Sequence, residues 1–322
     1  MFPFATHQIL DRAVLRQTVH DLALYSGAST WRARSQRARR ILTLHGVGGD
    51  DMPLHRFKQL MRWLRTHARI VPLPELLADL QSQRAPSQDL EIALTFDDGL
   101  ANQFHAAYPV LREMNLSATI FVCPQLIDER RWLWNHEARA RWKRLGAEVQ
   151  TALARDLGTD GRDANLVVAR MKELPDAARA ELCVRLRAAT SDFRPEPAES
   201  AAYDLMDWEQ IKRMDPALIT IGSHSLSHPI LTTLPDGDLE RELRDSRAEL
   251  ESRLDRSTPI FCYPNGSMDA RVRYHTSRYY DAAVSTAEAL IETKPIDLWA
   301  LPRIPVSSHL GLSVWRLHSP QS

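Results

Sequence analysis

The sequence has few of the features that mark small secreted proteins or membrane proteins. It contains three cysteines, which lie far apart and form no Cys-x-x-Cys pair: Cys123, Cys183 and Cys262. A disulfide framework and a thiolate zinc site are therefore not expected, and we predict buried, reduced thiols. No apolar run approaches the length that spans a bilayer. Because the N-terminus also lacks the apolar core of a secretory signal, we expect a cytoplasmic protein.

Net charge and two common catalytic motifs are also missing. The 41 Lys and Arg residues balance the 41 Asp and Glu residues, so no overall field attracts nucleic acid or anionic membrane. A local basic run over residues 31–40 is compatible with peripheral contact with phosphate or anionic lipid. A solvated helix face is the favoured interpretation of this run. No G-x-S-x-G motif is present, which argues against a serine esterase.

Short apolar runs alternate with longer amphipathic stretches from Ile41 onward. The predicted strands are continuous in apolar character, as strands buried on both faces are: residues 41–44, 92–96, 118–122, 218–221, 259–262, 282–285 and 303–306. Helical periodicity separates them, with one helix ending near Asn115 and another starting after Pro235. This alternation predicts a parallel sheet with right-handed crossovers, and about seven such units favour an α/β barrel.

Two segments depart from this alternation. Residues 1–40 are predicted to form an N-terminal helical extension to a barrel over 41–322. A helical insertion is predicted at about 128–206, because this stretch is rich in Arg, Ala, Glu and Leu and contains no convincing strand. A lid, a dimer surface and a substrate wall all remain open as its role. Its tryptophans could stack on sugars, although anchoring the insertion is favoured: Trp132, Trp134 and Trp142.

Two polar motifs follow predicted strands. The stretch Thr95-Phe96-Asp97-Asp98-Gly99 places adjacent carboxylates at the end of one strand, where parallel α/β folds carry their active sites. The stretch from Gly222 to Pro229 follows another strand, and its histidines, His224 and His228, are expected to meet on one side of a helical turn. Two histidines and one carboxylate with open positions form a catalytic rather than a structural metal set.

Together the T-F-D-D-G and H-S-x-x-H-P motifs resemble those of the polysaccharide deacetylase family. This family is also called the NodB-homology domain or carbohydrate esterase family four, and the resemblance runs from about Ile41 to Val306. It implies a distorted (β/α)7 barrel of the NodB type, interrupted here by the helical insertion. It also implies that Asp97 is the catalytic base, and that a divalent cation is bound by Asp98, His224 and His228. Zinc is the expected metal, with cobalt, nickel and manganese as alternatives.

The implied reaction is hydrolysis of N-acetyl groups on an N-acetylhexosamine-containing glycan or glycan precursor. Metal-activated water would attack the acetamide carbonyl while Asp97 takes the proton. The carbohydrate substrate and the missing signal suggest a cytosolic step in exopolysaccharide biosynthesis. Hydrolysis of another amide, such as a ureide or a cyclic imide, is the alternative reaction. A non-catalytic carbohydrate-binding relic is a third reading, but it predicts damage to the Asp/His set, and no such damage is visible.

The family's third motif, usually R-x-P-Y-G, is altered here and resembles a Y-P-x-G branch. Cys262 stands at the arginine position and Asn265 at the aromatic position. We predict that Arg303, on the last strand, supplies the missing guanidinium, with a surface ion pair as the alternative. The backbone N–H of Tyr263 is a candidate oxyanion donor, and Pro264 and Asn265 are candidate substrate contacts.

Two further roles remain open from the sequence. His45 ends the first strand and is expected either to line the site or to be a buried structural residue. The family's L-x-H motif, whose histidine is the general acid, has no clean copy. His309, His318 or a water molecule are the candidates for that acid.

Overall fold

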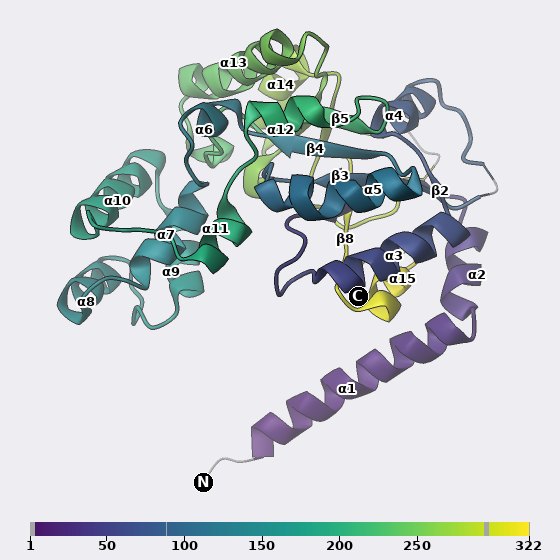
Figure 1. Cartoon of the computed structure of the whole chain (residues 1–322), viewed down its shortest axis with the longest axis horizontal. Coiled ribbons are helices and arrows are strands. Elements are labelled where there is room, and N and C mark those ends of the chain that lie inside the picture. Colours follow the sequence, from purple (N-terminus) through teal and green to yellow (C-terminus); the bar gives the residue numbers. More distant parts are fainter. Residues whose placement is uncertain (1–3, 88, 293–295, 322) are drawn as a thin grey trace.

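The computed structural model describes residues 4–87, 89–292 and 296–321. Its described residues form one parallel sheet with the strand order β7-β6-β5-β4-β3-β1-β8, and β2 pairs with β3. The sheet curls into an open half-barrel (Figure 1). Its strands are β1 (Arg40–Leu44), β2 (Arg69–Ile70), β3 (Glu91–Phe96), β4 (Ala118–Val122), β5 (Ile219–Ser223), β6 (Ile260–Cys262), β7 (Ala282–Val284) and β8 (Ile304–Pro305).

The seven predicted strands and their parallel arrangement are confirmed. Strand β2 was not predicted, because a two-residue strand is too short to produce an apolar run. A bridge between Val284 and Leu301 places the segment before β8 beside β7. The two ends of the half-barrel therefore approach each other through this segment.

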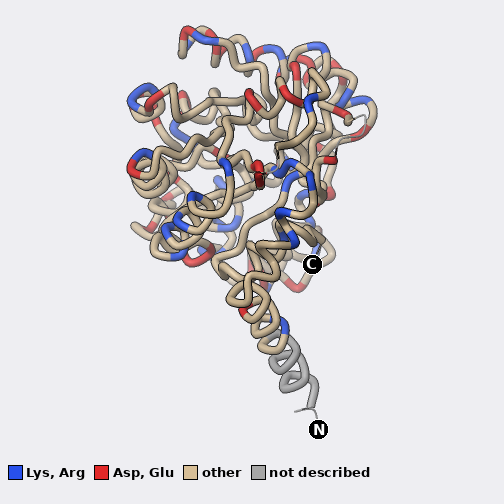
Figure 2. Tube along the Cα trace, turned by 90° about the vertical axis from the view of Figure 1, so that its right-hand side faces the viewer, with Lys and Arg blue, Asp and Glu red and all other residues tan. Residues whose placement is uncertain are grey.

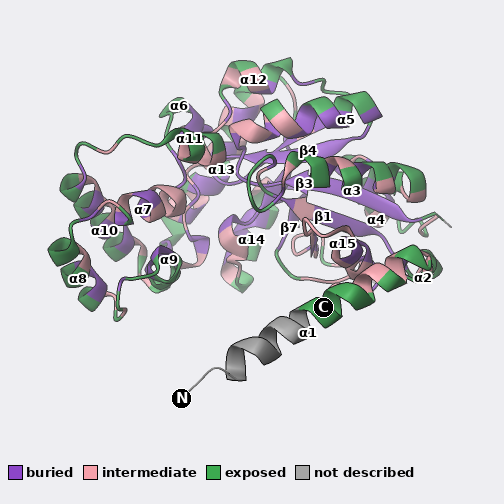
Figure 3. Ribbon diagram, turned by 60° about the horizontal axis from the view of Figure 1, so that its bottom comes forward, coloured by how far each residue is buried: buried purple, intermediate pink, exposed green. Residues whose placement is uncertain are grey.

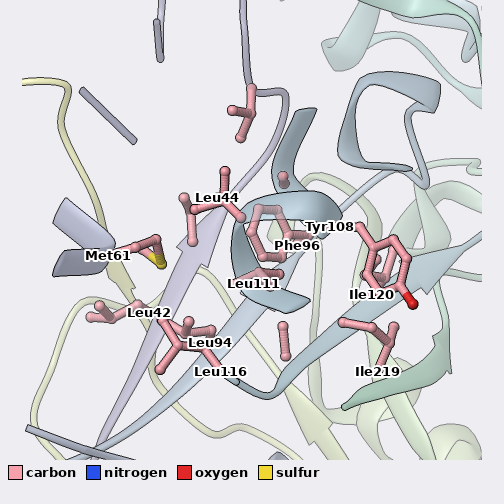
Figure 4. Packing of buried hydrophobic residues seen from close by; sticks show 14 of the residues in the cluster. Leu42, Leu44, Met61, Leu94, Phe96, Tyr108, Leu111, Leu116, Ile120 and Ile219 are labelled. Carbon is pink, nitrogen blue, oxygen red and sulfur yellow. The ribbon is translucent and has the colours of Figure 1, made fainter. Parts of the chain in front are cut away.

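The outer face of the sheet packs against helices. Leu42, Leu94 and Ile120 belong to one buried cluster with Met61 and Leu111, which come from covering helices (Figure 4). Full burial of one such aliphatic side chain stabilises the fold by roughly 1.5–3 kcal/mol. The covering helices include α3 (Leu54–His67), α5 (Tyr108–Met114), α13 (Asp236–Leu254) and α14 (Ala270–Tyr279). Helix α4 (Leu73–Gln81) contacts β3, and its leucines join the cluster on the other face of the sheet.

The inner face of the sheet forms a second cluster. Successive strand side chains point to opposite faces, so Ile41, Ala93 and Phe121 lie opposite the outer-face residues and pack together. The strands are buried while the covering helices expose one side to solvent (Figure 3). The same alternation continues along β3 from Ala93 through Thr95, and it aims Asp97 at the interior. The barrel interior therefore changes from apolar to polar toward the carboxyl ends of the strands.

The predicted helix ending near Asn115 is present but begins with a π-helical turn, η1 (Gln103–Ala107). Asn115 ends α5 in the left-handed conformation, with φ 53°. The second predicted helix is α13. A short 3-10 turn, η2 (Leu231–Thr233), lies before α13, and another, η3 (Pro264–Gly266), follows β6.

The insertion is helical and has a core of its own. Trp142 is 1% exposed and packs there with residues such as Leu153 and Val167. Its indole N–H donates to the carbonyl of Gly161 at 2.8 Å, so this tryptophan stabilises the insertion's own core rather than attaching the insertion to the barrel. The helices from β4 to β5 are α6 (Pro124–Asp128), α7 (Trp134–Trp142), α8 (Ala147–Asp156), α9 (Ala164–Glu173), α10 (Asp176–Ala189), α11 (Pro197–Tyr203) and α12 (Trp208–Arg213).

The N-terminal extension consists of α1 (Phe4–Tyr25) and α2 (Ala28–Ser35). Helix α1 projects from the body and contacts α15 (Leu310–Arg316) near the C-terminus (Figure 1). Basic and acidic residues are interspersed over the described surface (Figure 2). No helix among the described residues has both the length and the apolar character needed to cross a membrane.

The basic run before β1 is only partly the solvated face that we predicted. Arg40 is fully buried and donates to the carbonyls of Ala33 and Leu317, both at 2.7 Å. Arg39 is also buried and pairs with Glu91 at 3.1 Å. Buried guanidinium groups must be hydrogen-bonded, and these two arginines fasten the start of β1 to the extension and to β3.

Candidate active site

Polar side chains at the ends of four strands meet at one rim of the half-barrel. Asp97 and Asp98 follow β3, His224 follows β5, and Cys262 ends β6. Arg303 immediately precedes β8. This confirms the expectation that the residues following the parallel strands share one edge.

Asp98, His224 and His228 form a buried cluster with the donor set of a metal site. Asp98 Oδ1 lies 3.4 Å from His224 Nε2 and 3.6 Å from His228 Nε2. One ligand atom from each residue lies within 4.8 Å of the others. Three donors about 2 Å from one cation would be separated by such distances.

The protonation of the histidines fits a cation. His224 Nδ1 lies 2.8 Å from the carbonyl oxygen of Cys262, which can only accept, so Nδ1 carries the proton. His224 Nε2 points to Asp98 and is the ring nitrogen that would bind a cation. Burial lowers the pKa of His228 to about 3, so this imidazole is neutral at physiological pH. The residues present therefore fit a divalent metal.

The backbone around the cluster adopts positive φ values. Asp98 has φ 74° and His228 has φ 60°, which are uncommon for residues other than glycine. Gly99 has φ 66°, and a Cβ there would approach Val122 to 2.8 Å. Such backbone conformations persist where the surrounding structure enforces them, and they commonly occur at functional sites. The glycine of the T-F-D-D-G motif is thus required by the close approach of β4.

The segment from His224 to His228 is a loop, so the expected helical turn is wrong. Glu242, on α13, accepts hydrogen bonds from the backbone N–H groups of Leu226 and Ser227, both at 2.9 Å. It also accepts from the Ser227 hydroxyl at 2.6 Å. The loop is therefore fixed by a buried carboxylate rather than by helical hydrogen bonds. Glu242 could not be singled out from the sequence, because its partners are mostly backbone groups.

Asp97 lies beside the cluster and is held by Arg303. Two hydrogen bonds of 2.7 Å join Arg303 Nη1 and Nη2 to the two carboxylate oxygens. Burial alone would raise the pKa of Asp97, but the adjacent Arg303 guanidinium outweighs it and lowers that pKa to about 2. Arg303 is 1% exposed, so the alternative of a surface ion pair is wrong. Asp97 is consequently ionised and fixed in orientation.

A cavity of about 600 Å³ opens beside Asp98. One wall is the loop after β1, which includes His45 and Asp50, and the opposite wall includes His136 and Tyr203 from the insertion. His45 is exposed, so it lines the site rather than being a buried structural residue. Of the three roles left open for the insertion, it therefore has at least that of a cavity wall. His136 and Tyr203 were not singled out from the sequence, since neither belongs to a motif.

A sequence model described as polysaccharide deacetylase matches residues 84–280. The chain belongs to the polysaccharide deacetylase family. "Putative polysaccharide deacetylase YxkH" of Bacillus subtilis (strain 168) is 26% identical over 102 residues, which cover 31% of this chain and 37% of that protein. The similarity thus spans little more than a third of that curated relative.

Solved structures of deacetylases share the fold. The Streptococcus pyogenes deacetylase PplD in complex with acetate is similar with a TM-score of 0.59 and 17% identity, over 88% of this chain and 98% of that one. IcaB from Ammonifex degensii is similar with a TM-score of 0.56 and 17% identity, over 88% and 97% of the two chains. The predicted α/β barrel of the deacetylase type is therefore confirmed.

The altered third motif of this family member is explained by the geometry around Asp97. The Cys262 thiol lies 3.5 Å from Asp97 Oδ1 and 3.3 Å from Arg303 Nη2. The side chain at position 262 thus points at the same carboxylate that Arg303 holds. A guanidinium from β8 occupies the space that an arginine on β6 would otherwise fill.

The remaining residues of that motif differ from the sequence-based expectations. The backbone N–H of Tyr263, expected to face an oxyanion, is directed at the carbonyl of Val284 in β7 at 3.4 Å. The Tyr263 hydroxyl donates to the carbonyl of Trp299 at 2.8 Å. Pro264 and Asn265 are not among the residues that line the cavity beside Asp98. We therefore assign none of these three residues to substrate on the basis of the structure.

Neither candidate for the general acid reaches the cavity. His309 caps α15 by accepting from the N–H of Leu312, and its Nε2 lies 3.1 Å from Asp21 of α1. His318 Nε2 lies 3.3 Å from the hydroxyl of Ser29 in α2. Both histidines connect the C-terminal segment to the N-terminal extension, so the structure contradicts both as acids.

Proposed function

We propose that this chain is a metal-dependent hydrolase that removes N-acetyl groups from an N-acetylhexosamine-containing glycan or glycan precursor. One observation carries the proposal: a buried three-donor cluster lies beside an ionised carboxylate held by Arg303, and Asp98 of that cluster lines a cavity. Family membership supports deacetylation of carbohydrate as the class of reaction. Beyond this reaction class, we propose the bound metal, the roles of the individual residues and the acetyl group as the group removed.

The proposed metal ligands are Asp98, His224 and His228. A divalent cation bound there would lower the pKa of water and polarise the acetamide carbonyl as a Lewis acid. Two imidazoles and one carboxylate suit zinc, and they also accept cobalt, nickel or manganese. Asp98 lines the cavity, so substrate would approach the site from that cavity.

Asp97 is the proposed general base. Its low pKa keeps it ionised, and the paired Arg303 keeps both of its oxygens in place. It would accept a proton from the attacking water as the C–N bond of the acetamide is hydrolysed to acetate and a free amine. His45, which lines the cavity, would contact the sugar or its acyl group.

Acetate release tests the proposal. N-acetylglucosamine oligomers and lipid- or nucleotide-linked N-acetylhexosamines would be incubated with the full chain, with chelator, and with chelator followed by zinc. Asp97→Asn and His224→Ala are the site variants. His105→Ala is a matched control, because His105 is exposed and its Nε2 contacts Gln210 on the surface.

We expect metal-dependent acetate release by the wild type and the control, and loss of at least about 100-fold in both site variants. Release of ammonia or a ring-opened product from ureides or cyclic imides, without acetate from any sugar, would refute deacetylation and support the other amide hydrolysis. Acetate release that persists without metal would refute the assigned role of the cluster.

A further inference from the structure

The insertion reaches the proposed metal cluster through one side chain. His136, on α7, places its Nε2 3.7 Å from Oδ2 of Asp98. The other oxygen of that carboxylate, Oδ1, faces His224 and His228. The two oxygens of Asp98 therefore have separate partners, one set from the barrel and one from the insertion.

The proton on His136 can be located from its other neighbour. Arg139 Nη1 lies 3.3 Å from His136 Nδ1. An arginine can only donate, so Nδ1 must accept and the ring proton of the neutral imidazole sits on Nε2. Arg139 is itself held, because its Nε donates to Asn165 Oδ1 at 2.7 Å. The N–H of His136 consequently points toward the Asp98 carboxylate.

The ring of His136 is also fixed in orientation. It stacks on Tyr203 with a centroid separation of 4.4 Å and an interplanar angle of 19°. Tyr203 in turn contacts Trp132, whose indole N–H donates to Asp204 at 2.6 Å. Next in sequence, Leu205 pairs with Leu100, just after the T-F-D-D-G motif. The orientation of His136 is thus linked to the same loop that carries Asp98.

Within the described residues, His136 Nε2 is buried and has no hydrogen-bond partner. It is also outside the set whose ligand atoms lie within 4.8 Å of one another. A separation of 3.7 Å exceeds a formed hydrogen bond by about 0.7 Å, a gap that a small side-chain shift closes. The geometry therefore suits a donor to the outer oxygen of a metal-binding carboxylate better than a fourth ligand.

We propose that His136 is a positioning residue that donates a hydrogen bond to Oδ2 of Asp98 and thereby raises the affinity of the site for a divalent cation. This inference rests on the proposed metal site. A hydrogen bond to the outer oxygen holds the carboxylate in the orientation that binds metal, and loss of such a partner typically weakens metal affinity roughly 10- to 100-fold. The insertion would then contribute to metal binding as well as to the cavity wall.

The test is metal affinity of the full chain, measured by competition with a chromophoric chelator for zinc. His136→Phe keeps an aromatic ring on Tyr203 but removes the donor, whereas His136→Gln keeps an amide donor. His105→Phe is the matched control at a surface histidine. His136→Ala replaces His136→Phe if the latter does not fold. Thermal unfolding of each metal-free variant reports any merely structural effect.

We expect His136→Phe to bind zinc roughly 10- to 100-fold more weakly than the wild type, with the metal-free unfolding temperature little changed. His136→Gln should recover part of the affinity, and His105→Phe should match the wild type. Zinc affinity of His136→Phe within twofold of the wild type would overturn the inference, as would equal losses in the Phe and Gln variants.

The two proposals can fail separately. If His224→Ala abolishes zinc binding and the wild type releases acetate, an unchanged His136→Phe affinity refutes only the role of His136. If His136→Phe weakens zinc binding but no sugar yields acetate, the positioning role stands and the deacetylase proposal falls. Absence of zinc binding by the wild type would overturn both.

Discussion

Replacing Arg303 with methionine tests the support of Asp97 most directly. Met retains much of the buried volume but removes both 2.7 Å bonds to the carboxylate. It also removes the bond from Arg303 Nε to the carbonyl of Ser285 at 2.9 Å. Asp97 would then remain as a buried carboxylate beside the weak thiol of Cys262 and the imidazole of His224, without its guanidinium partner. Breaking a buried ion pair from one side costs about 3–5 kcal/mol.

We expect Arg303→Met to reduce turnover by more than the loss of folding stability alone would explain. Loss of an oriented general base removes a contribution of roughly 10²- to 10⁴-fold in rate. The turnover number for acetate release should fall by that factor, measured at saturating zinc. Zinc content should be retained, because the three metal ligands do not contact Arg303 in any described hydrogen bond or ion pair. Urea-induced unfolding would measure the accompanying loss of stability.

A double variant separates the two effects. Arg303→Met combined with Asp97→Asn removes the unpaired charge, so part of the lost stability should return while activity stays absent. Arg303→Met combined with Cys262→Arg moves the guanidinium to β6, where the thiol already lies 3.5 Å from Asp97. Partial recovery of turnover is expected in that pair. Wild-type turnover in a folded, zinc-loaded Arg303→Met protein would refute the reasoning.

Two further predictions concern the loop and the C-terminal segment. Glu242→Gln should lower the free energy of unfolding in urea by about 1–3 kcal/mol and weaken zinc binding. The reason is that one amide group cannot accept all three hydrogen bonds from the loop. The control Glu249→Gln, on the surface of the same helix, should change neither quantity. Burial, with the nearby Arg32 and Arg40, lowers the pKa of His318 to about 4, below its unfolded value of about 6.5. The unfolded chain therefore takes up the proton first as pH drops from 6.5 to 4. The full shift corresponds to about 3.4 kcal/mol, and because solvent screens part of it we expect stability to fall by about 1–2 kcal/mol. His318→Asn should show a shallower pH dependence than the wild type, and identical slopes would contradict this assignment.

The strands and the metal cluster could be predicted because each is local in sequence. A buried parallel strand is a continuous apolar run, and the run from Ile92 to Phe96 ends at the two carboxylates. The parallel arrangement then places His224, at the end of another strand, on the same rim as Asp98. Neither inference required knowledge of a distant contact.

The supporting residues could not be predicted in the same way. Glu242 and His136 lie on helices, in no motif, and their partners are 15 or more residues away or belong to another element. The helical turn assumed for His224 to His228 was wrong because the spacing of four residues also fits a loop held from outside. The burial of Arg40 could not be predicted either. A basic run is expected to be solvated unless the hydrogen-bond acceptors that would bury it are known.

Arg303 shows what a motif does and does not require. Asp97 lies on the interior face of the half-barrel, where residues from non-adjacent strands converge, so a guanidinium can reach it from more than one strand. In this chain Arg303 also contacts Thr95 at 3.1 Å and the Cys262 thiol at 3.3 Å, which fills the interior that a longer side chain at 262 would occupy. The site therefore requires a positive charge beside the Asp97 carboxylate, and the place of the arginine in the sequence matters less. If that is correct, a search for the missing arginine in related chains should follow the interior face of every strand, including strands that do not pair with β3, rather than the third motif alone.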